Sequence, residues 1–193
     1  SANFIALQAL DLPKGSKIIT PAGAAFPTTI SPIVYHKHIP VFVDCDNSLC
    51  IDLNEVEKAI KAHKAKAIVF AHTLGNMPDM ERLMKLAKKH ELKVMEDVCD
   101  AMGSVQNGYK AGTFGDIATV SFYPAHHITT GGEGGAILTN DYVLWRKCLS
   151  IRDWGRDCYC QHGGPQPACG GRWSNPPFDH KYYYTNLGMN LKL

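Results

Sequence analysis

Short apolar runs alternate with helical patterns along the first 150 residues, and this alternation constrains the fold more than any single motif does. Several of the runs are almost continuously apolar, which is typical of a mainly parallel sheet covered by helices on both faces. We therefore predict an α/β fold with three αβα layers. Strands are expected at 17–20, 41–44, 65–70, 92–97, 117–122 and 136–138. Helices are expected at 4–12, 28–37, 52–63, 79–90 and 141–150.

The composition is that of an ordinary globular protein. Of the 193 residues, 45% are hydrophobic and 20% are charged, and the formal net charge of +2 implies no nucleic-acid partner. No apolar run approaches the roughly 20 residues that cross a bilayer. The start lacks a basic leader, so we expect a cytoplasmic protein without a membrane segment. Both ends interrupt a pattern, and we expect a piece of a longer protein.

The stretch from Ser121 to Gly135 carries most of the candidate chemistry. It places a hydroxyl and the imidazole of His126 five residues apart, after an apolar run and before a glycine-rich loop. In parallel sheets, ligands bind at the carboxyl ends of the strands. A loop histidine is nevertheless more often without a catalytic role than a base, and the adjacent His127 offers the same chemistry.

Two other features invite a charged ligand. Asp97 ends an expected strand, where it could hold a cationic ring nitrogen; alternatively, it caps a following helix. Ser121 and the small residues Ser1, Ala2 and Asn3, at the start of a helix, could bind phosphate. Many helices begin with serine, so this signal is weak when taken alone.

Three thiols lie close together in a loop rich in glycine and proline. Cys158, Cys160 and Cys169 could wrap a metal or an iron–sulfur cluster, which normally takes four thiolates. Cys99 is the best fourth candidate because it neighbours Asp97. His162 is a rival ligand, and zinc is a rival metal. Cys45 and Cys148 have the simpler interpretation of core thiols, and Cys50 that of a loop thiol.

These motifs resemble the sugar aminotransferase and dehydratase family of fold-type I pyridoxal-phosphate enzymes. The resemblance implies that Ser1 and Ala2 end the phosphate-binding loop and that Ser121 also binds the cofactor phosphate. It implies further that Phe26 lies against the cofactor ring and that Asp97 pairs with the pyridine nitrogen.

The same resemblance implies a domain organisation. Residues 1–193 would form part of an aspartate-aminotransferase-like large domain, with a cysteine-rich cluster loop at about 152–180 and with the small C-terminal domain absent. Asn190 resembles the asparagine that reaches the cofactor phosphate of a neighbouring subunit. A homodimer is therefore implied.

One departure from the family pattern bears directly on function. Aminotransferases of the family carry a lysine that binds the cofactor covalently, where this chain has His126. Imidazole cannot form that bond, so the position resembles the 3-dehydrases of deoxysugar synthesis, in which histidine is the base and pyridoxamine phosphate is the cofactor. Asp100, in place of the usual glutamine or histidine, also resembles the dehydrases.

The cysteine spacing narrows the resemblance to the subgroup that dehydrates CDP-4-keto-6-deoxy-D-glucose with the help of a 2Fe–2S cluster. Cys99, Cys158, Cys160 and Cys169 match its ligands, although each gap here is one residue longer. This subgroup implies a CDP-sugar substrate in lipopolysaccharide O-antigen synthesis and an NADH-dependent flavin iron–sulfur reductase as partner. Two alternatives stay open: a cluster-free dehydratase or aminotransferase, and a zinc-stabilised binding module.

Overall fold

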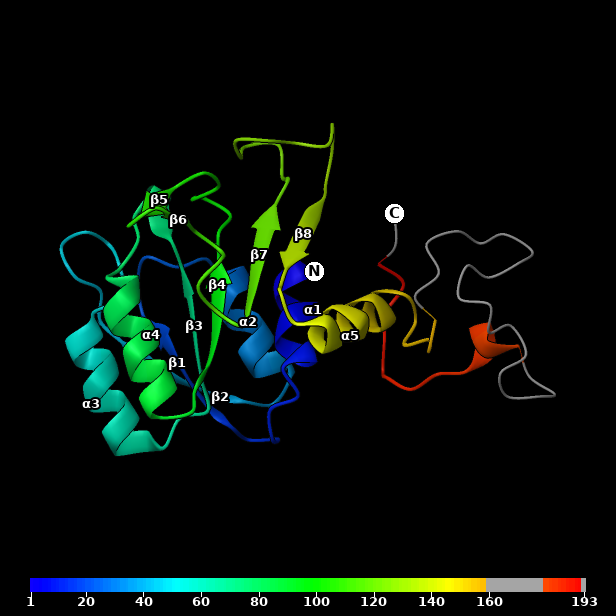
Figure 1. Ribbon diagram of the computed structural model, residues 1–193, viewed down its shortest axis with the longest axis horizontal. Helices are drawn as coiled ribbons and strands as arrows, with labels where there is room; N and C mark the ends of the chain where they lie inside the picture. Colours follow the sequence, from blue (N-terminus) through cyan, green and yellow to red (C-terminus); the bar gives the residue numbers. More distant parts are fainter. Residues whose placement is uncertain (159–178, 192–193) are drawn as a thin grey trace. The chain divides into compact units, whose positions relative to one another are not determined.

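The computed structural model describes residues 1–158 and 179–191 (Figure 1). The chain forms two compact units, Ser1–Asn140 and Asp141–Leu193. The first unit contains a six-stranded sheet in the order β2-β1-β3-β4-β7-β8, in which every neighbouring pair is parallel except β7 with β8. The expected mainly parallel sheet is therefore confirmed. Its strands are β1 (Lys17–Pro21), β2 (Ile39–Val43), β3 (Ala67–Ala71), β4 (Lys93–Asp97), β7 (Ile117–Ser121) and β8 (Gly135–Leu138).

Helices cover both faces of this sheet, which confirms the three layers. On one face α3 contacts β1 and β2, and α4 contacts β4. On the other face α1 contacts β7 and β8, and α2 contacts β2 and β3 (Figure 1). The helices are α1 (Ala2–Ala9), α2 (Pro27–Tyr35), α3 (Leu53–His63) and α4 (Met80–Lys89).

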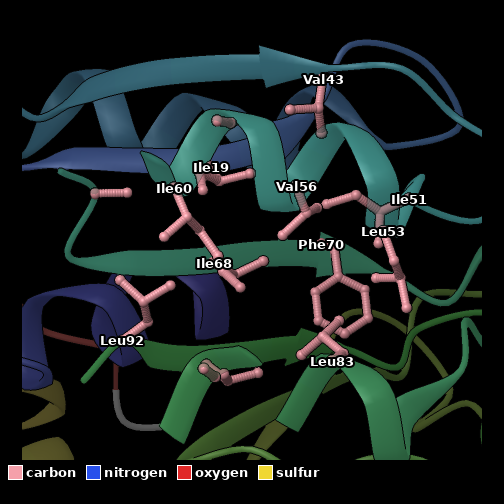
Figure 2. Packing of buried hydrophobic residues seen from close by; sticks show 14 of the residues in the cluster. Ile19, Val43, Ile51, Leu53, Val56, Ile60, Ile68, Phe70, Leu83 and Leu92 are labelled. Carbon is pink, nitrogen blue, oxygen red and sulfur yellow. The ribbon is translucent and has the colours of Figure 1, made fainter. Parts of the chain in front are cut away.

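The layer between the sheet and helices α3 and α4 is the larger described core cluster. All five residues of β3 are buried, as expected for a strand packed on both faces. Phe70, Ile68 and Leu83 are completely buried there (Figure 2). Burial of each such side chain contributes about 1.5–3 kcal/mol to folding. This packing fixes the central strands, and with them the residues at their carboxyl ends.

Aspartates begin the helices on this face. Oδ1 of Asp52 accepts the backbone N–H groups of Asn54 and Glu55, and Oδ1 of Asp79 accepts that of Arg82. Asp52 is therefore the N-cap of α3, and Asp79 that of α4. The Glu55 side chain, however, bonds Lys58, and the Asp52 backbone N–H donates to Asp44, so the reciprocal half of a capping box is not made.

A small hairpin was not predicted. The strands β5 (Val105–Gln106) and β6 (Tyr109–Lys110) pair in antiparallel fashion across Asn107 and Gly108. Both turn residues have positive φ, 52° and 83°, which is the signature of an Asn–Gly hairpin turn. The dipeptide was a usable signal, but the flanking strands are too short to show alternation.

The second unit is described by itself. It contains α5 (Tyr142–Arg152) and a short 3-10 helix, His180–Tyr182. Isolated bridges join Asp153 to Asn190 and Arg156 to Tyr184. Nδ2 of Asn186 donates to Oγ of Ser150 at 2.9 Å. These contacts hold the 179–191 segment against the end of α5. Throughout residues 1–158 and 179–191, no helix combines the length and apolarity that a bilayer crossing requires.

Candidate active site

The carboxyl ends of β3, β4 and β7 meet at one edge of the sheet. Asp97, the last residue of β4, pairs with Ala71 on β3 and with Thr119 on β7. Ser121 ends β7 and pairs with Gly135, the first residue of β8. The connection 122–134 therefore starts and finishes at this edge (Figure 1). Parallel sheets bind ligands at this edge.

Asp97 is held by side chains from two helices. Its Oδ2 accepts Nδ2–H of Asn3 at 2.8 Å and Oγ1–H of Thr29 at 2.7 Å. Its Oδ1 accepts the backbone N–H of Cys99 at 3.2 Å. The carboxylate is 1% exposed. The next element after Asp97 is the short strand β5, not a helix, so the interpretation of this residue as a helix cap is wrong.

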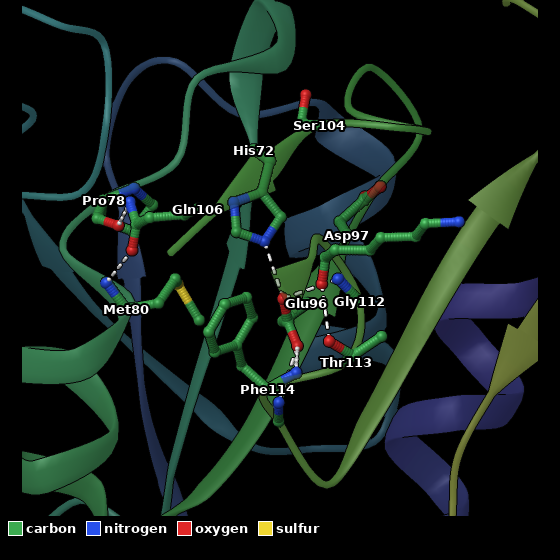
Figure 3. A network of polar contacts seen from close by, with 12 residues as sticks. His72, Pro78, Met80, Glu96, Asp97, Ser104, Gln106, Gly112, Thr113 and Phe114 are labelled. Atoms are coloured by element: carbon green, nitrogen blue, oxygen red, sulfur yellow. Dashed lines mark hydrogen bonds and ion pairs between the residues drawn. The ribbon is translucent and has the colours of Figure 1, made fainter. Parts of the chain in front are cut away.

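The preceding residue, Glu96, serves the opposite face of β4, because successive side chains of a strand alternate. Its Oε2 accepts Nε2–H of His72 and the N–H of Gly112, both at 2.9 Å. Its Oε1 accepts the N–H groups of Phe114 and Gly115 at 2.9 and 2.6 Å (Figure 3). Four donors thus surround a carboxylate with no exposed surface. This network ties the 112–115 turn to β3 and β4.

The donors around Glu96 determine its charge state. Burial acts to raise the pKa of the carboxyl, but the hydrogen bonds from His72, Gly115 and Gly112 outweigh burial and hold the pKa below its ordinary value. An ionised Glu96 can only accept, so Nε2 of His72 carries the proton. Glu96 is thus a buried structural anchor behind the site, whereas Asp97 faces the site.

His126, in the 122–134 connection, lies beside the carboxylate of Asp100. Its Nδ1 is 3.6 Å from Oδ1 of Asp100, and both side chains are mostly buried, at 18% and 19% exposure. A turn bond from its backbone N–H to the carbonyl of Tyr123 sets its position. His127, one residue on, is exposed. Oδ2 of Asp100 accepts the backbone N–H of Leu74 at 3.2 Å, which orients the acid.

The remaining expected cofactor residues surround the same edge. Ser121 is partly exposed, and its Oγ accepts the backbone N–H of Tyr123 at 3.2 Å. Ser1 begins α1 without a side-chain cap, which leaves the first amides of the helix available to an anion. A Cβ on Gly135 would lie 3.7 Å from Cβ of Ala2, so α1 begins beside the β7–β8 edge. Phe26 precedes α2, one turn before Thr29.

Cys99 lies within this site, where its backbone N–H donates to Oδ1 of Asp97. Burial, followed by the charge of Asp97, raises the pKa of its thiol, so the uncomplexed side chain is a neutral thiol. Among the described residues, no group of three or more His, Cys, Asp or Glu side chains is arranged to hold a metal ion. Two expected cluster ligands, Cys160 and Cys169, lie outside the described residues, as does His162.

The other expected residues belong to the second unit. Nε2 of His180 is 3.1 Å from Sγ of Cys158, and His180 is 6% exposed. Asn190 pairs with Asp153 in an isolated bridge within the same unit. The contact between His180 and Cys158 was not anticipated, because the two residues are 22 positions apart.

Sequence reasoning also missed the partners of the two strand-end acids. Glu96 and Asp97 are adjacent in a strand, so they must point to opposite faces, and each needs its own donors once buried. The sequence therefore allowed the prediction that each of the two acids needs donors on its own face of the strand. Asn3, Thr29 and Thr119 looked like ordinary helix and strand residues, and only the packing of α1 and α2 brings them to Asp97.

The whole chain, residues 1–193, matches the model of the DegT/DnrJ/EryC1/StrS aminotransferase family. The chain belongs to this family. It is 47% identical to the lipopolysaccharide biosynthesis protein RfbH of Salmonella typhimurium, with 100% of the chain and 47% of that protein covered. It is 45% identical to the dTDP-4-dehydro-2,6-dideoxy-D-glucose 3-dehydratase of Saccharopolyspora spinosa, with 100% and 44% covered.

A solved structure within the DegT/DnrJ/EryC1/StrS family agrees with the fold. A variant of GDP-4-keto-6-deoxymannose-3-dehydratase with bound GDP-perosamine superposes with a TM-score of 0.84 at 31% identity, over 99% of this chain and 50% of that one. The fold-type I architecture expected from the sequence is therefore confirmed. The chain spans about half the length of the curated relatives it matches.

Proposed function

We propose that the complete protein containing this chain is a pyridoxamine-phosphate-dependent 3-dehydrase of 4-keto-6-deoxy sugar nucleotides in deoxysugar or lipopolysaccharide synthesis. The observation that carries this proposal is His126, a mostly buried histidine at the carboxyl edge of the sheet, in place of the lysine of the related aminotransferases. Similarity to two proteins named as 3-dehydratases supports it.

The described donors and acceptors fit a pyridoxamine phosphate cofactor. A buried carboxylate, Asp97, would bind the ring nitrogen, and Phe26 would lie against the ring. The phosphate would bind to Oγ of Ser121 and to the uncapped amides that follow Ser1 and Ala2. Asn190, from the partner subunit of a homodimer, would add a contact to the phosphate.

When bound, pyridoxamine phosphate supplies an amine for the 4-keto group and a ring that accepts electrons. His126 would take a proton from the methylene carbon of the cofactor. Oδ1 of Asp100, close to Nδ1 of His126, favours the tautomer with its proton on Nδ1, which leaves Nε2 as the proton acceptor. The 3.6 Å separation exceeds a hydrogen bond, and such contacts often tighten when substrate binds.

Replacement of His126 in the full-length protein tests the assignment. His126→Asn should retain pyridoxamine phosphate but lower the dehydration rate by at least about 100-fold, because a positioned base contributes about 10²–10⁴-fold. His127→Asn is the matched control and should retain the wild-type rate. If His126→Asn dehydrates a 4-keto-6-deoxy sugar nucleotide at the wild-type rate, His126 is not the base.

We further propose that the substrate is CDP-4-keto-6-deoxy-D-glucose and that a 2Fe–2S cluster is bound by Cys99, Cys158, Cys160 and Cys169. The support is the cysteine spacing alone, since two of the four lie outside the described residues. Loss of the 3-hydroxyl as water and net reduction consume two electrons. NADH would supply them through a separate flavin iron–sulfur reductase.

Two measurements separate this finer proposal from its rivals. Anaerobically purified protein should contain two irons and two sulfides per chain and show sulfide-to-iron charge-transfer absorption. Protein that contains neither, but that dehydrates a sugar nucleotide, would be a cluster-free dehydratase. Turnover of CDP, GDP and dTDP 4-keto sugars, compared by kcat/KM, identifies the nucleotide. Stoichiometric zinc without cofactor binding would instead support a binding module.

A further inference from the structure

Four buried side chains from four elements form one hydrogen-bonded network at the centre of the candidate site. They are Asn3 on α1, Thr29 on α2, Asp97 on β4 and Thr119 on β7, and none is more than 9% exposed. Only Asp97 has a role in the proposed chemistry. The other three are polar groups whose burial is costly unless every donor and acceptor is used.

The orientation of the Asn3 amide is fully determined by its neighbours. Its Nδ2 donates to Oδ2 of Asp97 at 2.8 Å and to the carbonyl oxygen of Thr28 at 3.0 Å. Its Oδ1 accepts the hydroxyl of Thr119. A flipped amide would place Oδ1 against two acceptors, the Asp97 carboxylate and the carbonyl oxygen of Thr28. These acceptors orient the N–H side of Asn3, and the Thr119 hydroxyl satisfies its Oδ1.

Oδ2 of Asp97 then receives two donors, Nδ2–H of Asn3 and Oγ1–H of Thr29. Each donor needs a lone pair of Oδ2, so a proton on Oδ2 would displace one of them. Oδ1 accepts the backbone N–H of Cys99. The Cys99 thiol also hydrogen-bonds the Asp97 carboxylate. Because a thiol is a weak donor, a ring N–H of the cofactor would take its place. The network thus holds Asp97 as an acceptor and fixes its position.

We propose that Asn3, Thr29 and Thr119 are positioning residues that fix the Asp97 carboxylate through Oδ2, so that Oδ1 is directed at the pyridine nitrogen of the bound cofactor. This inference rests on the proposed function. It also links two ends of the site: Asn3 lies two residues from Ser1 at the expected phosphate position, and Thr119 lies two residues from Ser121. One network would therefore align the ring and phosphate contacts together.

The test uses the full-length protein and pyridoxamine phosphate labelled with ¹⁵N in the ring. In wild type, the ¹⁵N resonance of the bound cofactor should be that of a protonated pyridine. Thr29→Val keeps the shape and removes the donor, so the resonance should move toward the unprotonated frequency. The dissociation constant for pyridoxamine phosphate should rise at least about tenfold, because a hydrogen bond to a charged group is lost. Thr29→Ser should restore both values.

Two further variants complete the test. The Thr119 hydroxyl contacts Asn3 and not Asp97, so Thr119→Val acts through Asn3 and should move the ¹⁵N resonance in the same direction. If Thr29→Val does not fold, Thr119→Val serves as the test in its place. Thr113→Val is the control, since its exposed hydroxyl donates to Lys110 and not to the network. If wild type does not bind pyridoxamine phosphate, the proposed function fails. If wild type binds and every variant keeps the wild-type resonance, only the present inference is overturned.

Discussion

Nδ1 of His126 lies 3.6 Å from Oδ1 of Asp100, although the two residues are on separate connections at the carboxyl edge of the sheet. Asp100 follows β4, and His126 lies between β7 and β8. Oδ2 of Asp100 is held by the backbone N–H of Leu74, after β3. Two connections therefore meet at one imidazole, and a third holds its acidic partner. The adjacent His127 is exposed.

Asp100→Asn should slow dehydration without removing the cofactor. An amide can donate to Nδ1 as well as accept from it, so the favoured tautomer of His126 is no longer specified. We expect kcat to fall about 10- to 100-fold, with pyridoxamine phosphate affinity within about twofold of wild type. Steady-state kinetics and a binding titration measure the two effects.

The control for this variant is Glu133→Gln, which removes an exposed carboxylate from the connection that carries His126. It should leave kcat unchanged. Equal loss of activity in both variants would show that the general negative charge of the loop matters, and not the contact between Asp100 and His126.

His126→Lys should restore covalent capture of pyridoxal phosphate. The new amine would replace the imidazole at the position where related aminotransferases carry their lysine, and it would condense with the cofactor aldehyde. We expect a cofactor absorbance that survives dialysis and becomes permanent after borohydride reduction, together with loss of dehydration. His127→Lys, one position away, should not capture the cofactor. Capture by both variants would contradict the assigned geometry.

Glu96→Gln should destabilise the protein by about 2–4 kcal/mol, because Glu96 is a buried carboxylate that accepts four donors. The lowered pKa of Glu96 sets the pH dependence. Its contribution is fully present above the ordinary pKa of 4.5 that the unfolded chain has, and is lost as pH falls through the lower pKa of the folded state. The stability difference between wild type and variant should therefore shrink below about pH 4.5.

Urea unfolding at several pH values measures this difference. Glu81→Gln on α4 is the control, since Glu81 forms an exposed pair with Lys85 and its loss should leave the free energy of unfolding close to that of wild type. A stability difference for Glu96→Gln that does not change with pH would contradict an ionised, hydrogen-bonded Glu96.

Cys158→Ser should abolish stable iron binding while the protein still binds pyridoxamine phosphate. Serine is a poorer ligand for iron than a thiolate, and a four-thiolate cluster does not persist on three cysteines. Cys45→Ser is the control, because Cys45 lies outside the proposed ligand set and hydrogen-bonds the carbonyl of Gly23. Iron and sulfide content after anaerobic purification measures the effect. Full iron content in Cys158→Ser would remove Cys158 from the proposed ligand set.

Local patterns in the sequence were enough to predict the sheet and its layers. Near-continuous apolar runs such as 67–71 form strands buried on both faces, and Asp52 and Asp79 cap helices with their own side chains. The strand ends are likewise local, so Asp97 and Ser121 could be assigned to the carboxyl edge before the structure was known. The alternative of a helix cap at Asp97, which the structure contradicts, and the β5–β6 hairpin, which was not predicted, show where short-range patterns mislead.

By itself the sequence determined the residue types at the site: histidine at 126, a carboxylate at 97 and a hydroxyl at 121. Only the tertiary structure decided their partners. Asn3 reaches Asp97 across 94 positions and Asp100 lies beside His126 because α1 packs on β4 and β7 and because separate connections end at one edge. Such contacts follow from the packing of whole elements, which no local pattern of residues encodes.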